Sequence, residues 1–240
     1  MYIIILIVRY VMLINSMKVK ITARESGAEL CGIASAASFR HMPAGCRPQD
    51  IYSKCKSIVV YAKRMLPESM HAESCIPYTN LCNILSRQLD EIGIQICEKL
   101  EDMGMASVAI PSGDPFGYGH KDGGYAQGSL SLRHAGYQAG LGVIGRNNLL
   151  INMKLGNIIQ LGAVLVDTEL EPDRPAEYGI CPPDCRICAD ACPAHALDGP
   201  SVNYSLCRAQ SLCRNERGFE LYKCNICRKV CPYYAGIKVK

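Results

Sequence analysis

A repeated cysteine motif in the last third of the chain constrains this sequence most. The run CPPDCRICADACP covers residues 181–193, and its second half returns as CNICRKVCP at 224–232. Three closely spaced thiolates, a fourth from elsewhere, and a proline that turns the chain away are typical of [4Fe–4S] sites. Because the motif occurs twice, the spacing predicts two clusters that exchange their fourth ligands.

This exchange divides the cysteines into two sets of four. The first set comprises Cys181, Cys185, Cys188 and Cys231. The second set comprises Cys192, Cys224, Cys227 and either Cys207 or Cys213. Zinc held by the Cys-x2-Cys pairs is the alternative, but zinc does not need the third, x3-spaced cysteine that precedes a proline in both copies.

The remaining cysteines are scattered singly and are predicted to be small buried hydrophobes. They are Cys31, Cys46, Cys55, Cys75, Cys82 and Cys97. The total of 15 is odd, and a chain of 240 residues is large enough to fold without disulfides. We therefore expect a cytoplasmic protein with reduced thiols.

The net charge of +4 arises in the cysteine-rich part of the chain. Residues 181–240 hold nine Lys/Arg and five Asp/Glu, whereas the preceding 180 residues hold 17 of each. Such a mild excess of positive charge is compatible with anionic clusters, an acidic redox partner or RNA phosphate, and it does not distinguish between them.

The N-terminal residues 1–16 are strongly apolar. Their run is broken by Arg9 and is shorter than the roughly 20 residues of a membrane span. No basic region precedes it and no small-residue cleavage site follows. We expect an N-terminal extension, either an upstream start or an extra strand, and no membrane span.

Residues 17–172 show the pattern of an α/β (α+β) domain. Helices are predicted from Met17 and over 79–103, and strands over 31–35, 57–61, 106–111 and 157–167. The helix over 79–103 would bury Leu81, Ile84, Leu85, Leu89, Ile92 and Ile96. The glycine-rich segment 113–128 predicts a functional loop.

The acidic, proline-rich segment 168–179 predicts a domain boundary. Residues 173–240 would then form a two-cluster domain like that of bacterial ferredoxins.

One stretch narrows the choice of protein family. SLSLRHAGYQAGLGVIGRNNLLIN at 129–152, followed by EPDRP and the cysteines, resembles the epoxyqueuosine reductase family, which is related to reductive dehalogenases. GAELCGIASAASF at 27–39 is similar to the family's opening strands. The resemblance spans about residues 17–234. It implies a cobalamin-reductase-like N-terminal domain, a base-off cobalamin reduced through two [4Fe–4S] clusters, and Cys207 as the ligand in place of Cys213.

The resemblance also places four candidate cofactor-binding residues, Arg133, Gly142, Gly145 and Arg146, near the corrin. Together with Gly140, these glycines would let the backbone approach a planar ligand. A helix C-cap followed by a tight turn, with no ligand, explains the same glycines equally simply.

Two departures from the family affect the expected chemistry. The family's proton-donating aspartate falls at Ala126, so Asp122 and His134 are the candidate catalytic residues, with Asp114 and His120 as further choices. The chain also stops at Lys240, whereas the queuosine enzymes continue into a helical-repeat tail that helps to hold tRNA. We therefore expect a substrate other than epoxyqueuosine, and tRNA is a doubtful partner.

The sequence favours an oxidoreductase that passes single electrons through two clusters to a corrinoid or similar cofactor, which reduces a small substrate. A ferredoxin or flavodoxin would supply the electrons. The alternative is an electron-transfer or corrinoid-binding partner without substrate chemistry. The missing aspartate favours that alternative, and the large front domain favours the enzyme. A cluster-based oxidation sensor finds no support, because no DNA-reading helix is evident, and no DNA partner is expected.

Overall fold

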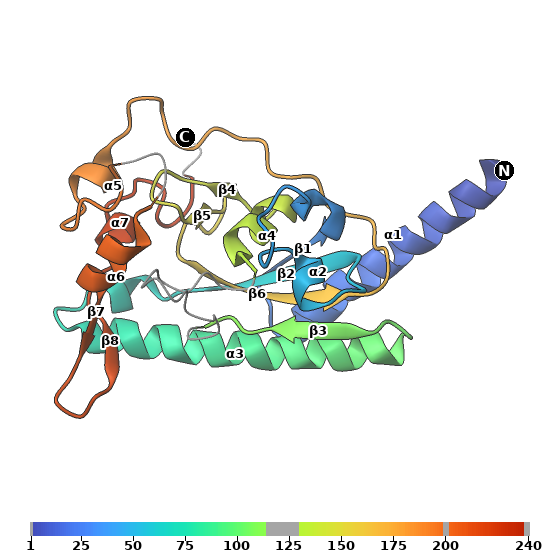
Figure 1. The fold of residues 1–240 in the computed structure, drawn as a ribbon, viewed down its shortest axis with the longest axis horizontal. Helices are drawn as coiled ribbons and strands as arrows, with labels where there is room; N and C mark the ends of the chain where they lie inside the picture. The colour runs from blue at the N-terminus through green and yellow to red at the C-terminus, as the bar shows by residue number, and fades with distance from the viewer. Residues whose placement is uncertain (1, 114–129, 199–201, 238–240) are drawn as a thin grey trace.

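A four-stranded sheet forms the centre of the computed structural model, which describes residues 2–113, 130–198 and 202–237, with side chains from Tyr10 onward (Figure 1). The strands are β1 (Leu30–Ser35), β2 (Ser57–Arg64), β3 (Ser107–Ile110) and β6 (Ile159–Val166). Their order is β1-β2-β6-β3, and all three pairings are antiparallel. The mixed helix-and-strand class predicted from the sequence therefore takes its α+β form.

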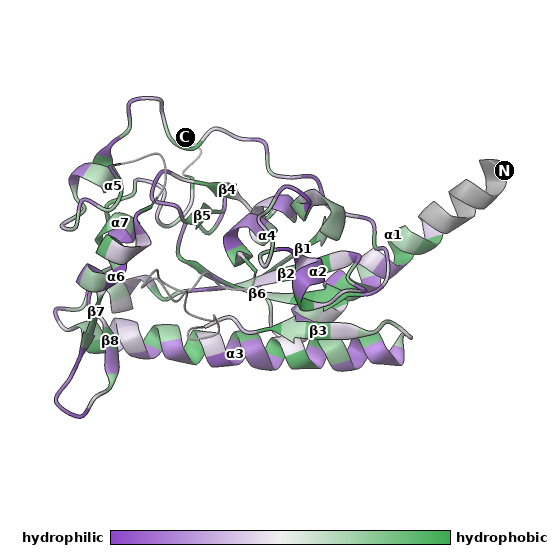
Figure 2. Ribbon diagram, in the orientation of Figure 1, coloured by the Kyte–Doolittle hydropathy of each residue, from purple (hydrophilic) through white to green (hydrophobic). Residues whose placement is uncertain are grey.

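Two long helices cover one face of this sheet, α1 (Tyr2–Glu25) and α3 (Cys75–Asp102). Leu89, Ile92 and Ile96 recur at helical spacing on α3 and pack against Val59 and Val164 of the sheet. Figure 2 shows the resulting alternation of hydrophobic and hydrophilic residues along α3. Because each such buried aliphatic side chain contributes about 1.5–3 kcal/mol, this apolar stripe fixes α3 on the sheet.

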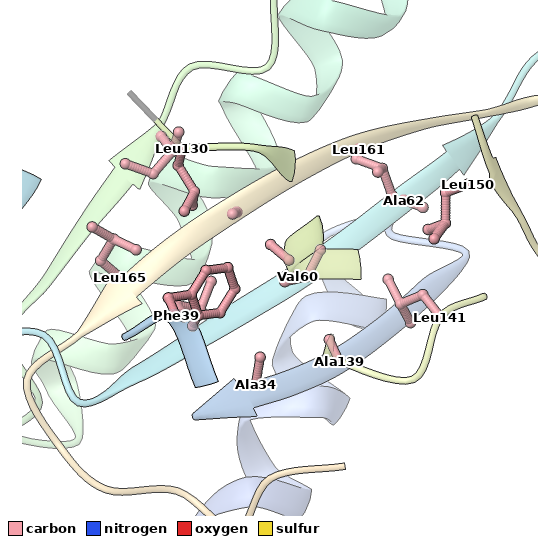
Figure 3. Packing of buried hydrophobic residues seen from close by; sticks show 14 of the residues in the cluster. Ala34, Phe39, Val60, Ala62, Leu130, Ala139, Leu141, Leu150, Leu161 and Leu165 are labelled. Carbon is pink, nitrogen blue, oxygen red and sulfur yellow. The ribbon is translucent and has the colours of Figure 1, made fainter. Parts of the chain in front are cut away.

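The opposite face packs against shorter elements. These are the 3-10 helix η1 (Ala36–Phe39), α4 (Leu132–Gln138), and the hairpin of β4 (Val143–Ile144) and β5 (Leu150–Ile151). Phe39, Val60 and Leu165 meet in this layer (Figure 3). The short helix α2 (Pro48–Ile51) lies near η1, and η2 (Pro67–Met70) lies near α3.

Tyr61 shows how the sequence makes room for a large side chain beneath α3. Its ring is fully buried, and its hydroxyl donates a hydrogen bond to the backbone oxygen of Leu89 at 2.9 Å. A Cβ atom at Gly162, the cross-strand partner of Tyr61, would lie 2.4 Å from the ring, and one at Gly93 would lie 2.5 Å from the hydroxyl. A larger residue at either glycine position would therefore clash with the Tyr61 side chain.

The extra strand predicted for residues 1–16 is wrong, because these residues continue α1. The first turns of α1 extend away from the sheet (Figure 1). Ser16 donates to the oxygen of Met12 at 2.7 Å, one helical turn back, and accepts from the N–H of Glu171 at 2.7 Å. The helix is thus continuous with its buried part around Val19 and Ala23.

The strands predicted over 31–35, 57–61, 106–111 and 157–167, and the helix over 79–103, are confirmed within a few residues. The helix predicted from Met17 is present but begins much earlier, at Tyr2. One member of the predicted apolar stripe is wrong, because 39% of Ile84 is exposed. Ile84 precedes Leu85 by one residue, which turns its side chain about 100° away from the buried stripe.

The predicted boundary segment, residues 168–179, contains neither helix nor strand but forms hydrogen bonds with α1, β1 and β2. Asp173 accepts from the backbone N–H of Ile33 at 2.8 Å and from Lys20 Nζ at 2.6 Å. Leu170 is buried, and its N–H donates to Ser57 Oγ at 2.9 Å. These bonds hold the segment that precedes the cysteines against α1 and the sheet.

The part of the chain that follows, residues 180–237, is called the cysteine segment below. Its elements are short: α5 (Ile187–Asp190), α6 (Tyr204–Ser211), β7 (Leu212–Arg214), β8 (Glu220–Tyr222) and α7 (Ile226–Lys229). It packs on the β4–β5 hairpin through Ile180 and Cys231, and on the start of α3 through Tyr234. In the described ranges, no helix combines the length and apolar character needed to cross a bilayer.

Candidate metal centres and the adjoining pocket

The two cysteine motifs adopt the same local structure. In each copy a single helical turn, α5 or α7, follows the first cysteine of the repeat, and a Cys-Pro turn closes the motif. The N–H of His195 donates to the oxygen of Cys192 at 3.1 Å, and the N–H of Tyr234 donates to the oxygen of Cys231 at 3.0 Å. Proline's fixed φ suits the second position of both turns. Because α5 and α7 pack together, the sequence repeat is also a structural repeat.

Four thiols form a first cysteine group: Cys181, Cys185, Cys188 and Cys231. Burial raises the pKa of Cys188, and the charges of Cys181, Cys185 and Cys231 raise it further. Burial also raises the pKa of Cys231, to which Cys181 and Cys185 again contribute. The structure thus brings together the first set expected from the sequence, although its ligation of a cluster stays a prediction.

Four other thiols form a second cysteine group: Cys192, Cys207, Cys224 and Cys227. Burial raises the pKa of Cys207, and Cys224 and Cys192 add to the increase. Burial raises the pKa of Cys227 to about 11, with further contributions from Cys207, Cys224 and Cys188. Since Cys188 belongs to the first group, the two groups adjoin.

Cys213 lies in β7 opposite Leu221, whereas the charges of Cys192 and Cys224 act on Cys207. The choice of Cys207 over Cys213 as the fourth ligand of the second group stays a prediction.

The donor chemistry of these groups fits [4Fe–4S] clusters. A four-iron cube takes one thiolate at each iron, and each group contains four cysteines. Thiols of raised pKa stay protonated without a metal, and they must release their protons when they bind one.

The loop of the β4–β5 hairpin donates hydrogen bonds to the cysteine segment. The backbone N–H of Arg146 donates to Cys181 Sγ at 3.5 Å, and the Arg146 guanidinium donates to the oxygen of Pro183. Asn147 Nδ2 donates to the oxygen of Cys227 at 3.1 Å. Arg146, predicted to lie near a corrin, is thus placed beside the first cysteine group.

Arg133, the other predicted cofactor-binding arginine, joins α4 to α6. Its guanidinium donates to the oxygen of Asn148 at 2.6 Å and to the hydroxyl of Tyr204. The guanidinium carbon also lies 5.5 Å from the centre of the Tyr204 ring, a distance at which a cation and an aromatic ring attract each other.

A pocket of about 160 Å³ lies where α4 and β6 approach α7. Leu132, Leu150 and Leu161 contribute apolar surface to its lining, and Arg133 and Arg228 contribute positive charge. The pocket therefore combines apolar walls with cations, and it includes one residue from the second cysteine motif.

Two further residues of this pocket, Asn157 and Gln160, carry buried oxygens without a partner. Among the described residues, Asn157 Oδ1 and Gln160 Oε1 accept no hydrogen bond. Leaving such a buried acceptor unpaired costs about 1–3 kcal/mol.

The glycines of the 140–145 turn have structural roles inside the protein. Gly140 (φ +73) ends α4: its N–H donates to the oxygen of Tyr137 at 3.0 Å, and the N–H of Leu141 donates to the oxygen of Gly136 at 2.9 Å, a Schellman cap.

Cβ atoms at Gly142 and Gly145 would lie 2.5 Å and 2.6 Å from atoms of Ile151. Close packing of the hairpin thus accounts for both glycines, and their contact with a cofactor stays a prediction.

Of the predicted catalytic residues, only His134 lies within the described structure. Its Nδ1 is 2.7 Å from Ser131 Oγ, and burial together with the charge of Arg133 lowers its pKa. This lowered pKa favours the neutral ring near pH 7, which accepts a proton more readily than it donates one. Asp122, with Asp114, His120 and Ala126, lies outside the described residues.

The sequence analysis missed Asn157, Tyr204 and Arg228. Arg228 could have been noticed because it follows Cys227 directly inside the motif. Asn157 and Tyr204 carried no signal, because only the folded chain brings them to the cysteine groups and to Arg133.

Two groups of known reductases are similar to this chain. Epoxyqueuosine reductase of Staphylococcus aureus is 39% identical over 123 residues, covering 47% of this chain and 32% of the relative. Tetrachloroethene reductive dehalogenase of Dehalobacter restrictus is 49% identical over 174 residues, covering 71% of this chain and 27% of the relative. The chain resembles epoxyqueuosine reductases and reductive dehalogenases. Both names denote enzymes that reduce their substrates, and the chain spans about a third of the length of these relatives. No protein-family profile matches the chain.

Solved structures of epoxyqueuosine reductases and reductive dehalogenases share the fold. Epoxyqueuosine reductase from Streptococcus thermophilus superposes with a TM-score of 0.63 at 21% identity, covering 92% of this chain and 66% of that protein. A catabolic reductive dehalogenase gives a TM-score of 0.57 at 18% identity, covering 90% of this chain and 31% of that protein. The match therefore extends through both the sheet and the cysteine segment.

Proposed function

We propose that this chain is an iron–sulfur oxidoreductase. In this proposal its two cysteine groups hold two [4Fe–4S] clusters, which supply single electrons for reduction of a small molecule in the pocket beside α4. The proposal is supported by the reductases that the chain resembles and by the donor chemistry of the two groups.

One observation carries the proposal: residues that adjoin both cysteine groups line the pocket beside α4. The backbone N–H of Asn157 donates to the oxygen of Tyr234 at 3.0 Å, in the Cys-Pro turn that begins at Cys231 of the first group. Arg228 follows Cys227 of the second group in the chain, and its guanidinium donates to the oxygen of Asn157. An electron that leaves either group therefore has a short route to the pocket.

The pocket residues have roles that follow from their chemistry. Arg133 and Arg228 would attract an anionic group or stabilise negative charge that develops when an electron arrives. Asn157 and Gln160 would accept hydrogen bonds from the ligand and orient it. The leucines of the wall would keep water away, which strengthens both interactions.

Cobalamin binding is a separate and weaker part of the proposal. A reductive dehalogenase with the same fold is described by its title as carrying out B12-dependent dehalogenation. In this chain the pocket of about 160 Å³ is far smaller than a corrin requires, and Gly142 and Gly145 pack against Ile151. The described residues do not form a corrin-sized cradle, so no step is assigned to that cofactor.

The alternative is an electron carrier or corrinoid-binding partner without substrate chemistry. A surface hollow of about 530 Å³ beside Cys185, lined also by Asp184, Arg186 and Tyr233, favours it, because a redox protein docked there would meet the first group. The pocket beside α4 distinguishes the two functions, since a carrier has no use for it.

The first experiment is anaerobic reconstitution with iron and sulfide, followed by iron analysis and absorption spectra with and without cobalamin. About eight irons per chain are expected, and Cys188→Ser should lose about half of them. Cys82→Ser is the matched control, because Cys82 lies on α3 beside Tyr78. Equal iron loss in the two variants would refute the ligand assignment.

The second experiment tests the pocket. Reduced protein should be oxidised by epoxides or organohalides, the substrate types that the relatives' names indicate, and Gln160→Leu should slow this several-fold while the iron content is unchanged. A solved epoxyqueuosine reductase complex contains a tRNA-Tyr stem loop, so that RNA belongs in the same screen. If only redox proteins oxidise the clusters and Gln160→Leu has no effect, the carrier is correct.

A further inference from the structure

We propose that the pocket beside α4 binds a small carboxylate that also carries a hydroxyl or amino group. The pocket, about 160 Å³ in volume, presents two arginines together with two side-chain oxygens that have no hydrogen-bond partner among the described residues. The inference rests on the proposed function and deepens it, since it names the class of substrate that the reductase would take. Binding of that molecule requires no electron, so it can be tested separately.

The charged groups of the pocket are positive. Arg133 comes from α4 and Arg228 from α7, and no Asp or Glu of the described residues lines the pocket. Asp90 bonds a lining residue, Ser112, at 2.8 Å and 2.5 Å but does not itself line the pocket. Neither arginine has an ion-pair partner within the described ranges. Because two protonated guanidiniums repel each other, an anion in this pocket is favoured.

Both guanidiniums keep donors for such an anion. Within the part of the chain that the structure describes, Arg133 donates to the oxygen of Asn148 at 2.6 Å and to the hydroxyl of Tyr204. Arg228 donates to the oxygen of Asn157. A guanidinium has five N–H donors in a planar fork that matches a carboxylate. Each arginine can therefore bind an oxyanion and keep the contacts that position it.

Two amide oxygens define the other half of the ligand. Only 1% of Asn157 is exposed, and its Nδ2 donates to the oxygen of Arg228 at 3.2 Å. Gln160 Nε2 donates to Ser86 Oγ at 2.6 Å. These bonds orient the amides and leave Asn157 Oδ1 and Gln160 Oε1 without a partner among the described residues. A carboxylate cannot satisfy these oxygens because it only accepts hydrogen bonds, so the ligand must also carry an O–H or N–H group.

Size and polarity exclude other occupants. Pockets for drug-sized ligands begin at about 300 Å³, so a whole nucleotide does not fit a volume of about 160 Å³. A neutral haloalkane would contact the leucines of the wall but would leave both arginines without a counter-charge and both oxygens unpaired. A small hydroxycarboxylate or aminocarboxylate provides a partner for all four groups.

The test is a calorimetric titration of the oxidised, reconstituted protein with glycolate, the simplest hydroxycarboxylate. Acetate lacks the hydroxyl and should bind about tenfold more weakly, because a buried acceptor then stays unpaired. Ethylene glycol lacks the carboxylate and should show no binding. Inorganic phosphate, which tests whether any oxyanion suffices, should bind more weakly than glycolate. Gln160→Leu should remove most of the difference between glycolate and acetate.

The arginines are tested separately. Arg133→Gln and Arg228→Gln should each weaken glycolate binding about tenfold or more, because each removes a charged donor to the carboxylate. The use of two variants covers the case in which one of them does not fold. Arg217→Gln is the matched control, because Arg217 is an exposed arginine of the same cysteine segment that does not line the pocket. It should leave the affinity unchanged.

Three results would overturn the inference. They are no binding of glycolate, equal affinities for glycolate, acetate and phosphate, or glycolate binding that both arginine variants leave unchanged. Failure of the protein to take up iron, or to be oxidised by any substrate, would instead refute the proposed function. In that case the same titrations would still decide which class of molecule the pocket binds.

Discussion

Ile33, Val60 and Leu165 of the sheet are fully buried, whereas the side chains of α6 and α7 in the cysteine segment are at most partly buried. The sheet has apolar layers on both faces. The cysteine segment has short elements, two Cys-Pro turns and eight grouped thiols. The sheet region can thus be stabilised by burial of apolar surface, while in the proposed function the cysteine segment gains stability from the clusters that its thiols bind.

The largest expected effect follows directly from this difference. Removal of iron with a chelator should leave the sheet folded and release the cysteine segment, because cluster binding supplies the stability that its core lacks. Hydrogen exchange should show amides of α5 and α7 losing protection while those of β2 and β6 keep theirs. If chelation left the protection of all four elements unchanged, the expected difference in stability between the two regions would be wrong.

A core truncation should produce the opposite pattern. Leu165→Ala leaves a cavity among Phe39, Val60 and Ile58, so the free energy of unfolding should fall by about 2–5 kcal/mol. Iron content per folded chain should not change. Chemical denaturation and iron analysis of the same sample check both statements, and an iron loss would show that the two regions do not fold independently.

A smaller effect is expected at the connection between the regions. Asp173→Ala removes the acceptor of the Ile33 N–H and the partner of Lys20. Leaving that N–H without a partner should cost about 1–3 kcal/mol. Glu177→Ala is the comparison in the same segment, because Glu177 is exposed. Thermal unfolding of the two variants should differ accordingly.

The smallest expected effect is a loss of stability at alkaline pH that arises from one thiol of the sheet region. Burial raises the pKa of Cys55 from 9.0 to about 11. The unfolded thiol ionises first, so the stability from this group is full below about pH 9 and is lost as pH rises toward 11. The wild-type protein should therefore lose stability between these values more steeply than Cys55→Ala. Parallel pH profiles from denaturant titrations would show that Cys55 does not contribute.

Much of the sheet region could be predicted because its apolar residues recur with regular periods. The β2 run from Ser57 and the α3 stripe through Leu89 and Ile96 are visible in the sequence alone. The first 16 residues were ambiguous, because a run rich in isoleucine and valine is compatible with either a strand or a helix. Only the helical bond at Ser16 and the burial of Val19 decide between them.

The candidate site was predictable only in part. Cysteine spacing separates the two groups because ligands on one tight loop are also close in space. The partners of those groups are not close in sequence: Asn157 is 71 residues from Arg228 of the second motif, and Tyr204 is 71 residues from Arg133. Such contacts depend on how the β4–β5 hairpin meets the cysteine segment, and a local pattern does not contain that information.

The interleaving of the two groups affects the order in which a newly made chain can mature. Cys181, Cys185 and Cys188 leave the ribosome together, but their fourth partner, Cys231, is made 43 residues after Cys188. At about 5–20 residues per second, that delay is roughly 2–9 s. In the proposed ligation, the second group is complete when Cys227 is made, four residues earlier than the first. Cluster insertion into the first group would therefore await synthesis of residue 231, and a ribosome that stalls in this interval would carry the three other thiols of that group unligated beside a finished sheet.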